Sequence, residues 1–136
     1  MIVWRALSGF FRVISRVFGW KPQVKPGLEG LLPHWTGILE RWHTRDPHQL
    51  QAAVLEADKL LDEALRILGV SGASAGERLK NGRSSFKSEA GYQAAWEGHK
   101  LRNRLAHELG NADVYELSRG LNFYHQAFRE LGLTND

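Results

Sequence analysis

Residues 46–69 have the sequence DPHQLQAAVLEADKLLDEALRILG, and this stretch indicates a helical protein. Asp46 and Pro47 are typical of the cap and the first position of a helix, and Gly69 is typical of the residue that ends one. Between them, apolar residues recur every three or four positions: Leu50, Val54, Ala57, Leu61, Ala64, Leu65 and Leu68. We therefore predict one long amphipathic helix that Gly69 closes.

Similar signals on both sides of this helix predict further helices. Apolar spacing indicates helices over about 33–44 and 89–108, and capping boxes at Ser74 and Asp113 open helices over about 75–81 and 114–131. A basic, polar connector fills 82–88. Strand signals are nearly absent. Because the connections between long helices are short, we predict an all-α, up-and-down bundle of four main helices, preceded by an amphipathic N-terminal helix.

Composition limits what the chain can do. Its 136 residues suffice for one domain, and the absence of cysteine excludes disulfides, zinc sites with thiolate ligands and cysteine nucleophiles. Residues 1–28 carry five basic and no acidic side chains, whereas the remainder carries 13 basic and 15 acidic ones. The basic charge thus belongs to the N-terminus, which argues against a broad nucleic-acid surface and leaves room for a local patch.

Residues 1–20 predict an amphipathic basic helix, which a linker over 21–27 joins to the bundle domain of 28–136. On a helical wheel the three arginines fall within about 40° of one another, and most of the rest is apolar. The arginines argue against a spanning helix and against a signal peptide. The segment suits either a membrane interface or packing on protein. The residues expected to make that contact are Trp4, Arg5, Phe10, Phe11, Arg12, Arg16, Phe18 and Trp20.

The segment KLRNRLAHE, residues 100–108, concentrates potential chemistry in about two helical turns. Arg102 supplies a fixed cation, Asn103 a polar orienting group, and His107 a side chain of the type that titrates near neutrality. These are the groups that phosphodiester chemistry would use. The spacing of Arg102, Asn103 and His107 resembles the motif of the HEPN superfamily (higher eukaryotes and prokaryotes nucleotide-binding), and the resemblance extends loosely over residues 47–132.

The resemblance implies a helical bundle, often dimeric, in which two motif helices meet at the interface. Many members are metal-independent endoribonucleases, and others are non-catalytic binding or scaffold domains. In a ribonuclease, His107 would take the proton from a ribose 2′-hydroxyl, Arg102 would stabilise the charged phosphorane, and Asn103 would hold the phosphate or the imidazole. The product would be a 2′,3′-cyclic phosphate, with no metal or cofactor. Residues expected to bind the RNA substrate are His99, Lys100, Arg104, Arg83 and Lys87.

Helical geometry adds a condition. Arg102 and His107 are five residues apart, about 140° around a helix, so one straight helix cannot easily aim both at one phosphate. We therefore expect a homodimer in which a second copy completes the site.

Structural explanations compete with each of these roles. His107 suits a helix C-terminus, and Arg102 could simply pair with Glu56 or Asp58 on the long helix. His99 and Asn103, four residues apart, suit a buried polar pair. The other histidines are scattered, so no metal site is expected.

Three functions stay open: a ribonuclease, a non-catalytic module that binds RNA, a nucleotide or protein, and a helical interaction protein at the membrane. We expect a cytoplasmic protein, lying at the inner face of the membrane if residues 1–20 bind lipid.

Overall fold

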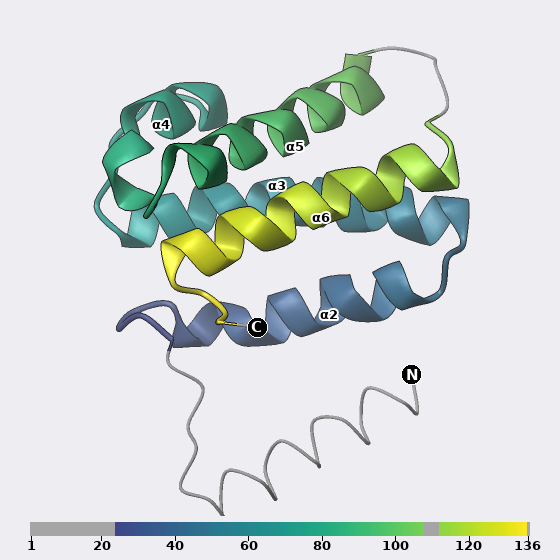
Figure 1. The fold of residues 1–136 in the computed structure, drawn as a ribbon, viewed down its shortest axis with the longest axis horizontal. Coiled ribbons are helices and arrows are strands. Elements are labelled where there is room, and N and C mark those ends of the chain that lie inside the picture. The colour runs from purple at the N-terminus through teal and green to yellow at the C-terminus, as the bar shows by residue number, and fades with distance from the viewer. Residues whose placement is uncertain (1–23, 108–111, 136) are drawn as a thin grey trace, which may run out of the picture.

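The computed structural model describes residues 24–107 and 112–135, and every regular element in these ranges is a helix (Figure 1). The prediction of an all-α fold is therefore confirmed for the described chain. The sequence predicted neither of its two short 3-10 helices. In chain order the elements are η1 (Glu29–Leu31), α2 (Leu32–His43), α3 (Pro47–Ile67), α4 (Ala75–Asn81), η2 (Arg83–Ser85), α5 (Glu89–His107) and α6 (Val114–Leu131).

Helix α3 organises the bundle, because it contacts α2, α4, α5 and α6. Figure 1 shows α3 and α6 in the middle, with α2 on one side of them and α4 and α5 on the other. The α5 and α6 helices also pack directly on each other. A polar group on α3 can therefore reach side chains from both α5 and α6.

Three predicted caps are present at helix starts. The side chains of Asp46, Ser74 and Asp113 accept hydrogen bonds from backbone N–H groups three residues later, at 3.0, 3.1 and 2.7 Å. Each bond satisfies one of the N–H groups that a helix start leaves without an intrahelical partner. At the C-terminus of α6, Gly132 ends the helix with a positive φ of 90°, a conformation that glycine adopts at little cost.

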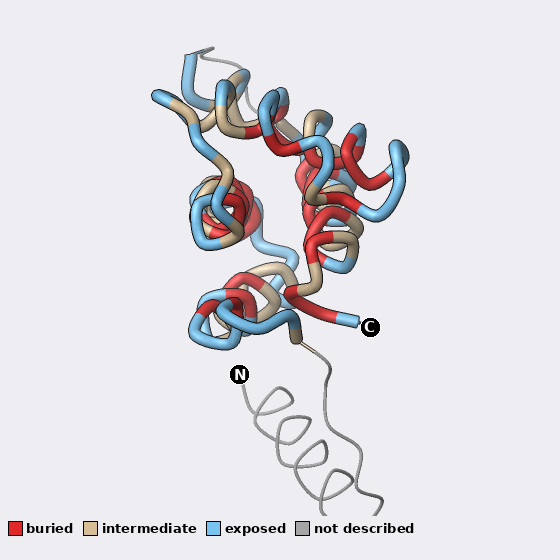
Figure 2. The backbone as a smooth tube through the Cα atoms, turned by 90° about the vertical axis from the view of Figure 1, so that its left-hand side faces the viewer, coloured by how far each residue is buried: buried red, intermediate tan, exposed pale blue. Residues whose placement is uncertain are grey.

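The core forms where the apolar faces of the helices meet, and Figure 2 shows the buried residues on the inward sides of the backbone. The apolar stripe predicted from residues 46–69 is buried except for Leu68, which is partly buried. Trp35 on α2 packs edge-on against Phe128 of α6, with ring centroids 5.0 Å apart. Helices α2 and α6 are thus joined by aromatic contact.

Two glycines let α5 and α6 approach closely. A Cβ atom on Gly98 would lie 2.8 Å from the ring of Tyr124, and one on Gly120 would lie within 2.3 Å of Leu101. The ring of Tyr124 therefore lies directly against the backbone of α5. This contact matters for the site, because the hydroxyl of Tyr124 extends from that position towards α3.

Residues 1–20, the predicted amphipathic helix, lie outside the described residues. Of the predicted linker 21–27, only 24–27 are described, and the Lys25 backbone N–H donates a 2.8 Å hydrogen bond to the Gly132 carbonyl. Among the helices of the described ranges, none combines the length and the apolar character that crossing a bilayer requires.

Candidate functional site: a polar cluster centred on Asp58

The residues of the Arg102–His107 motif lie on the C-terminal half of α5, where that helix packs against α3 and α6. Asp58 of α3 faces them from inside the bundle and is only 5% exposed. A carboxylate at such a position is costly unless it is paired and hydrogen-bonded. The side chains that meet this requirement come from α5 and α6.

Two buried side chains donate to the same carboxylate oxygen of Asp58. The hydroxyl of Tyr124, on α6, donates to Oδ1 over 2.8 Å, and Nδ1 of His99, on α5, lies 2.9 Å from the same atom. Tyr124 is fully buried and His99 is 7% exposed. Asp58 thus joins three helices at one point, through hydrogen bonds of the strong, charge-assisted kind.

The hydrogen bonds indicate which ring nitrogen of His99 carries the proton. Because Oδ1 of Asp58 accepts, Nδ1 of His99 is the donor, which leaves Nε2 as an acceptor in the neutral ring. Nε2 lies 3.3 Å from the amide nitrogen of Asn103, which donates to it. His99 and Asn103 therefore form the polar pair that the sequence offered as the structural alternative, and Asp58 anchors it.

Arg102 lies at the outer edge of this cluster. Its Nε is 3.7 Å from Oδ2 of Asp58, and its terminal nitrogen donates a 3.3 Å hydrogen bond to Oδ1 of Asn103. The ion pair with Asp58, one of the two partners that the sequence suggested, is thus present. The Arg102 side chain remains 36% exposed, so one edge of the guanidinium is held by protein and donors remain for a ligand.

Burial fixes the protonation state of Tyr124. Desolvation raises the pKa of this phenol well above its ordinary value of 10.0, and the charge of Asp58 and the hydrogen bond to it act in the same direction. The positive charge of Arg102 opposes this shift. Tyr124 is therefore a neutral donor at physiological pH. In the described part of the chain, no buried side-chain nitrogen or oxygen atom lacks a hydrogen-bond partner.

His107 stands apart from this cluster. It is the last described residue of α5, it is exposed, and no hydrogen bond or ion pair holds its imidazole within the described ranges. The structure therefore brings Arg102, Asn103 and His99 together around Asp58 and leaves His107 about 140° further around α5 from Arg102.

The other residues expected to bind substrate lie on the surface, and three of them have acidic partners. Lys100 pairs with Glu97 at 2.9 Å, Arg83 pairs with Glu89 at 2.6 Å, and Arg104 pairs with Glu116 of α6. Lys87 is exposed and lines a surface hollow together with Lys25. The eight residues predicted to contact membrane or protein, Trp4 to Trp20, lie outside the described residues.

Metal ligands do not gather in this region. Among residues 24–107 and 112–135, no group of three or more histidine, cysteine or acidic side chains is placed to hold a metal ion.

Sequence reasoning missed the organising role of Asp58 and any polar role of Tyr124. A signal for Asp58 was available, since it lies four residues after Val54 and three before Leu61, within the apolar stripe of α3. A charged residue at such a position is rarely buried without a specific partner. Tyr124 carried no comparable signal, because its spacing on α6 is equally typical of a core aromatic.

No family model, no curated protein and no solved structure matches this chain.

Proposed function

We propose that this chain is a metal-independent endoribonuclease of the HEPN type, with an active site that forms between two copies. One observation carries the proposal: Arg102 is held by Asp58 and Asn103 at the edge of the bundle, while the imidazole of His107 is exposed on the same helix. An anchored guanidinium can bind a phosphate bidentately and loses little further side-chain conformational entropy when it does so. An exposed imidazole can reach a substrate.

In this mechanism each residue has one task. The imidazole of His107 removes the proton from a ribose 2′-hydroxyl, and the 2′-oxygen attacks the adjacent phosphorus. The bond to the 5′-oxygen of the next nucleotide breaks, and that oxygen takes a proton from water as it leaves, while the proton on His107 is later released to solvent. Arg102 stabilises the extra negative charge on the phosphorane oxygens. The products are a 2′,3′-cyclic phosphate and a 5′-hydroxyl.

The cluster around Asp58 would serve this reaction by positioning. The amide nitrogen of Asn103 donates to His99, and its amide oxygen accepts from Arg102. Because His99 is fixed, Asn103 and through it the guanidinium of Arg102 are held in place. Asp58 holds both ends of this chain of contacts. His99 is then a positioning residue, rather than one that touches RNA, because both of its ring nitrogens already have partners.

The direct experiment is an RNA cleavage assay in EDTA. The purified chain is incubated with single-stranded RNA, and the new ends are analysed chemically. The proposal requires cleavage with 2′,3′-cyclic phosphate ends. RNA that stays intact at micromolar protein, or cleavage that EDTA abolishes, contradicts it.

A non-catalytic RNA-binding module is the second candidate. The observation that favours it is that Arg102, Asn103 and His99 satisfy one another within a single chain, as structural residues do. Such a module would bind RNA with an affinity that falls as salt rises, and would leave the strand uncut.

We also infer that residues 1–20 attach the protein to a membrane surface. The apolar sector expected there covers most of the helix circumference, whereas a helix that packs on protein needs an apolar stripe little more than about 100° wide. A lipid interface can cover such a broad sector, and the arginine stripe suits anionic headgroups.

Vesicle flotation tests this membrane inference. The full chain is expected to float with anionic phosphatidylglycerol vesicles, and the double variant Phe10→Asp, Phe18→Asp to stay at the bottom of the gradient, because two charges enter the apolar sector. Ile67→Asp, an exposed position on α3, is the matched control and should float like the wild type. Equal flotation of the double variant and the wild type would rule out attachment through this segment.

A further inference from the structure

Helix α6 carries aromatic and basic side chains along one face, where Tyr115 and Arg119 are exposed and Phe123 is half-buried. Tyr115, Arg119 and Phe123 follow one another at four-residue intervals and therefore share a face. Tyr115 is 77% exposed, and the only other large apolar side chain that is exposed in the described ranges is Ile67, at 41%. Arg119 places its guanidinium carbon 5.5 Å from the centroid of the Phe123 ring. We call Tyr115, Arg119 and Phe123 the α6 stripe.

A hollow between α5 and α6 lies beside the stripe. Its volume is about 310 Å³, and Arg119 and Phe123 line it together with Lys100 and Arg104 of α5. The two carboxylates in its lining, Glu97 and Glu116, pair with Lys100 and Arg104. Arg119 is therefore the one cation of this hollow that has no carboxylate partner among the described residues.

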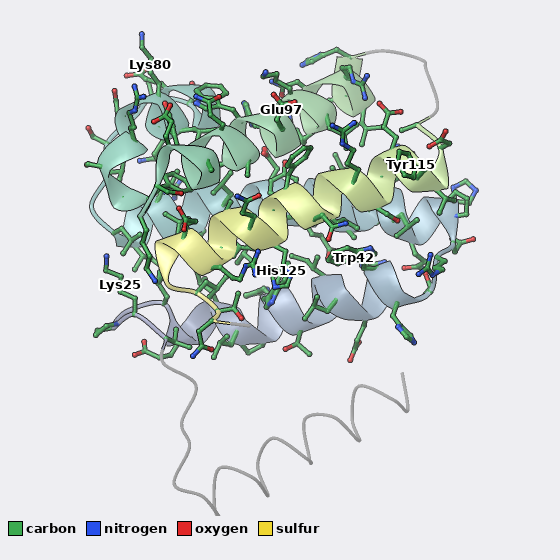
Figure 3. The ribbon with its side chains drawn as sticks, viewed as in Figure 1. Lys25, Trp42, Lys80, Glu97, Tyr115 and His125 are labelled. Carbon is green, nitrogen blue, oxygen red and sulfur yellow. The ribbon has the colours of Figure 1, made fainter. Side chains whose placement is uncertain are left out.

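The stripe begins at the end of the bundle where α5 finishes. The ion pair between Arg104 and Glu116 holds the last turn of α5 beside the first turn of α6. His107 belongs to that last turn and Tyr115 to that first turn. Figure 3 shows Tyr115 at this end of α6, pointing away from the core. A strand lying along the stripe would thus lead towards His107.

We propose that the α6 stripe is a stacking platform for single-stranded RNA, an inference that rests on the proposed ribonuclease function. Tyr115 and Phe123 lie about 12 Å apart along the helix axis, far enough to hold different bases of one strand. Aromatic rings bind unpaired bases by stacking, whatever their sequence, and an interleaved cation binds the backbone. Duplex RNA buries its base faces, so the platform selects single strands.

The choice of RNA over a second copy of this chain follows from the chemistry of the face. Large aromatic rings alternating with an arginine that has no carboxylate partner within residues 24–107 and 112–135 suit an anionic, planar ligand. A self-complementary interface would need acidic groups free to meet Arg119, and both carboxylates of the hollow are already paired.

Binding is measured on the full chain carrying His107→Ala, so that the probe is not cut. The probe is a fluorescein-labelled, single-stranded A-rich 12-nucleotide RNA, followed by anisotropy. Tyr115→Ala is expected to weaken binding about tenfold, since one stacked base is lost, and Tyr115→Phe to bind like the parent. Arg119→Ala is expected to lower the slope of log affinity against log salt by about 0.7. Ile67→Ala is the matched control and should change nothing.

Three outcomes overturn the platform. The first is that Tyr115→Ala binds the RNA probe as tightly as Ile67→Ala does. The second is that the parent chain does not bind the probe. The third is a Tyr115→Ala chain that sediments as a monomer where the parent is a dimer, because a second copy then covers this face. Parallel cleavage assays separate the two proposals. If Tyr115→Ala cleaves RNA at the wild-type rate, the ribonuclease proposal is retained and the platform is rejected. If RNA binding depends on Tyr115 but the wild type does not cleave RNA, the platform is retained and the ribonuclease proposal is rejected.

Discussion

Replacing Asp58 with alanine is expected to lower the free energy of unfolding by about 3–5 kcal/mol. The substitution leaves Nδ1 of His99 and the hydroxyl of Tyr124 buried without their acceptor, and Arg102 loses its ion pair. Hydrogen bonds to a charged group contribute about 1.5–3 kcal/mol each, and the loss of one partner exposes the full desolvation cost of the others. Urea denaturation followed by circular dichroism measures the change.

Two variants on the same helix calibrate this result. Asp58→Asn keeps an oxygen acceptor for His99 and Tyr124, so it should lose less stability than the alanine variant. Glu63→Ala removes an exposed carboxylate whose ion pair with Arg66 is 3.7 Å long, and should change stability by less than about 0.5 kcal/mol. If Asp58→Ala unfolds at the same urea concentration as Glu63→Ala, the cluster does not organise the bundle.

The second large effect concerns catalysis. His107→Ala is expected to slow RNA cleavage in EDTA by about 10²–10⁴-fold, the typical contribution of a general base. Arg102→Ala should slow it by about 10²–10³-fold, because charge on the phosphorane is no longer stabilised. His107 is exposed and has no partner in the described ranges, so its variant should unfold like the wild type. Loss of activity in that variant therefore cannot be attributed to loss of structure.

His48→Ala is the matched control for this pair. His48 is an exposed histidine in the first turn of α3, at the start of a different helix. It should cleave RNA at the wild-type rate. Cleavage by His107→Ala at that same rate would assign the activity to another site or to a contaminant.

The helices were predictable because their signals are local. Asp46, Ser74 and Asp113 each act within three residues, and the apolar spacing that follows each cap depends only on the helical period. No long-range information was needed to place the starts of α3, α4 and α6. The turn η1 was not predicted, since its three residues carry no cap that binds through a side chain.

The polar cluster was only partly predictable, because its contacts join residues far apart in the chain. The pair of His99 and Asn103 follows from four-residue spacing on one helix. Tyr124 lies 66 residues from Asp58 on a different helix, and its ring occupies the space that a side chain at Gly98 of α5 would fill. Helix spacing alone indicates which face a residue occupies, and does not indicate which helix that face will meet.

Arg78 illustrates the same limit for surface charge. Arg78 lies on α4, and arginine side chains are mostly solvated, yet only 13% of this side chain is exposed. Its guanidinium pairs with Asp62 at 2.8 Å and donates to the carbonyls of Val70 and Gly72. Arg78 thus holds the loop between α3 and α4. Sequence identifies the charge, and only the path of the loop shows that the charge is structural.

The shared active site can be tested by mixing two inactive variants. Arg102→Ala and His107→Ala are combined in equal amounts and allowed to exchange subunits, and RNA cleavage in EDTA is measured before and after exchange. If one copy supplies the guanidinium and the other the imidazole, half of the dimers are mixed and each has one intact site of two, so about a quarter of the wild-type rate should return. A mixture that exchanges subunits, as native mass spectrometry can show, and stays as inactive as its components would contradict an active site built from two copies.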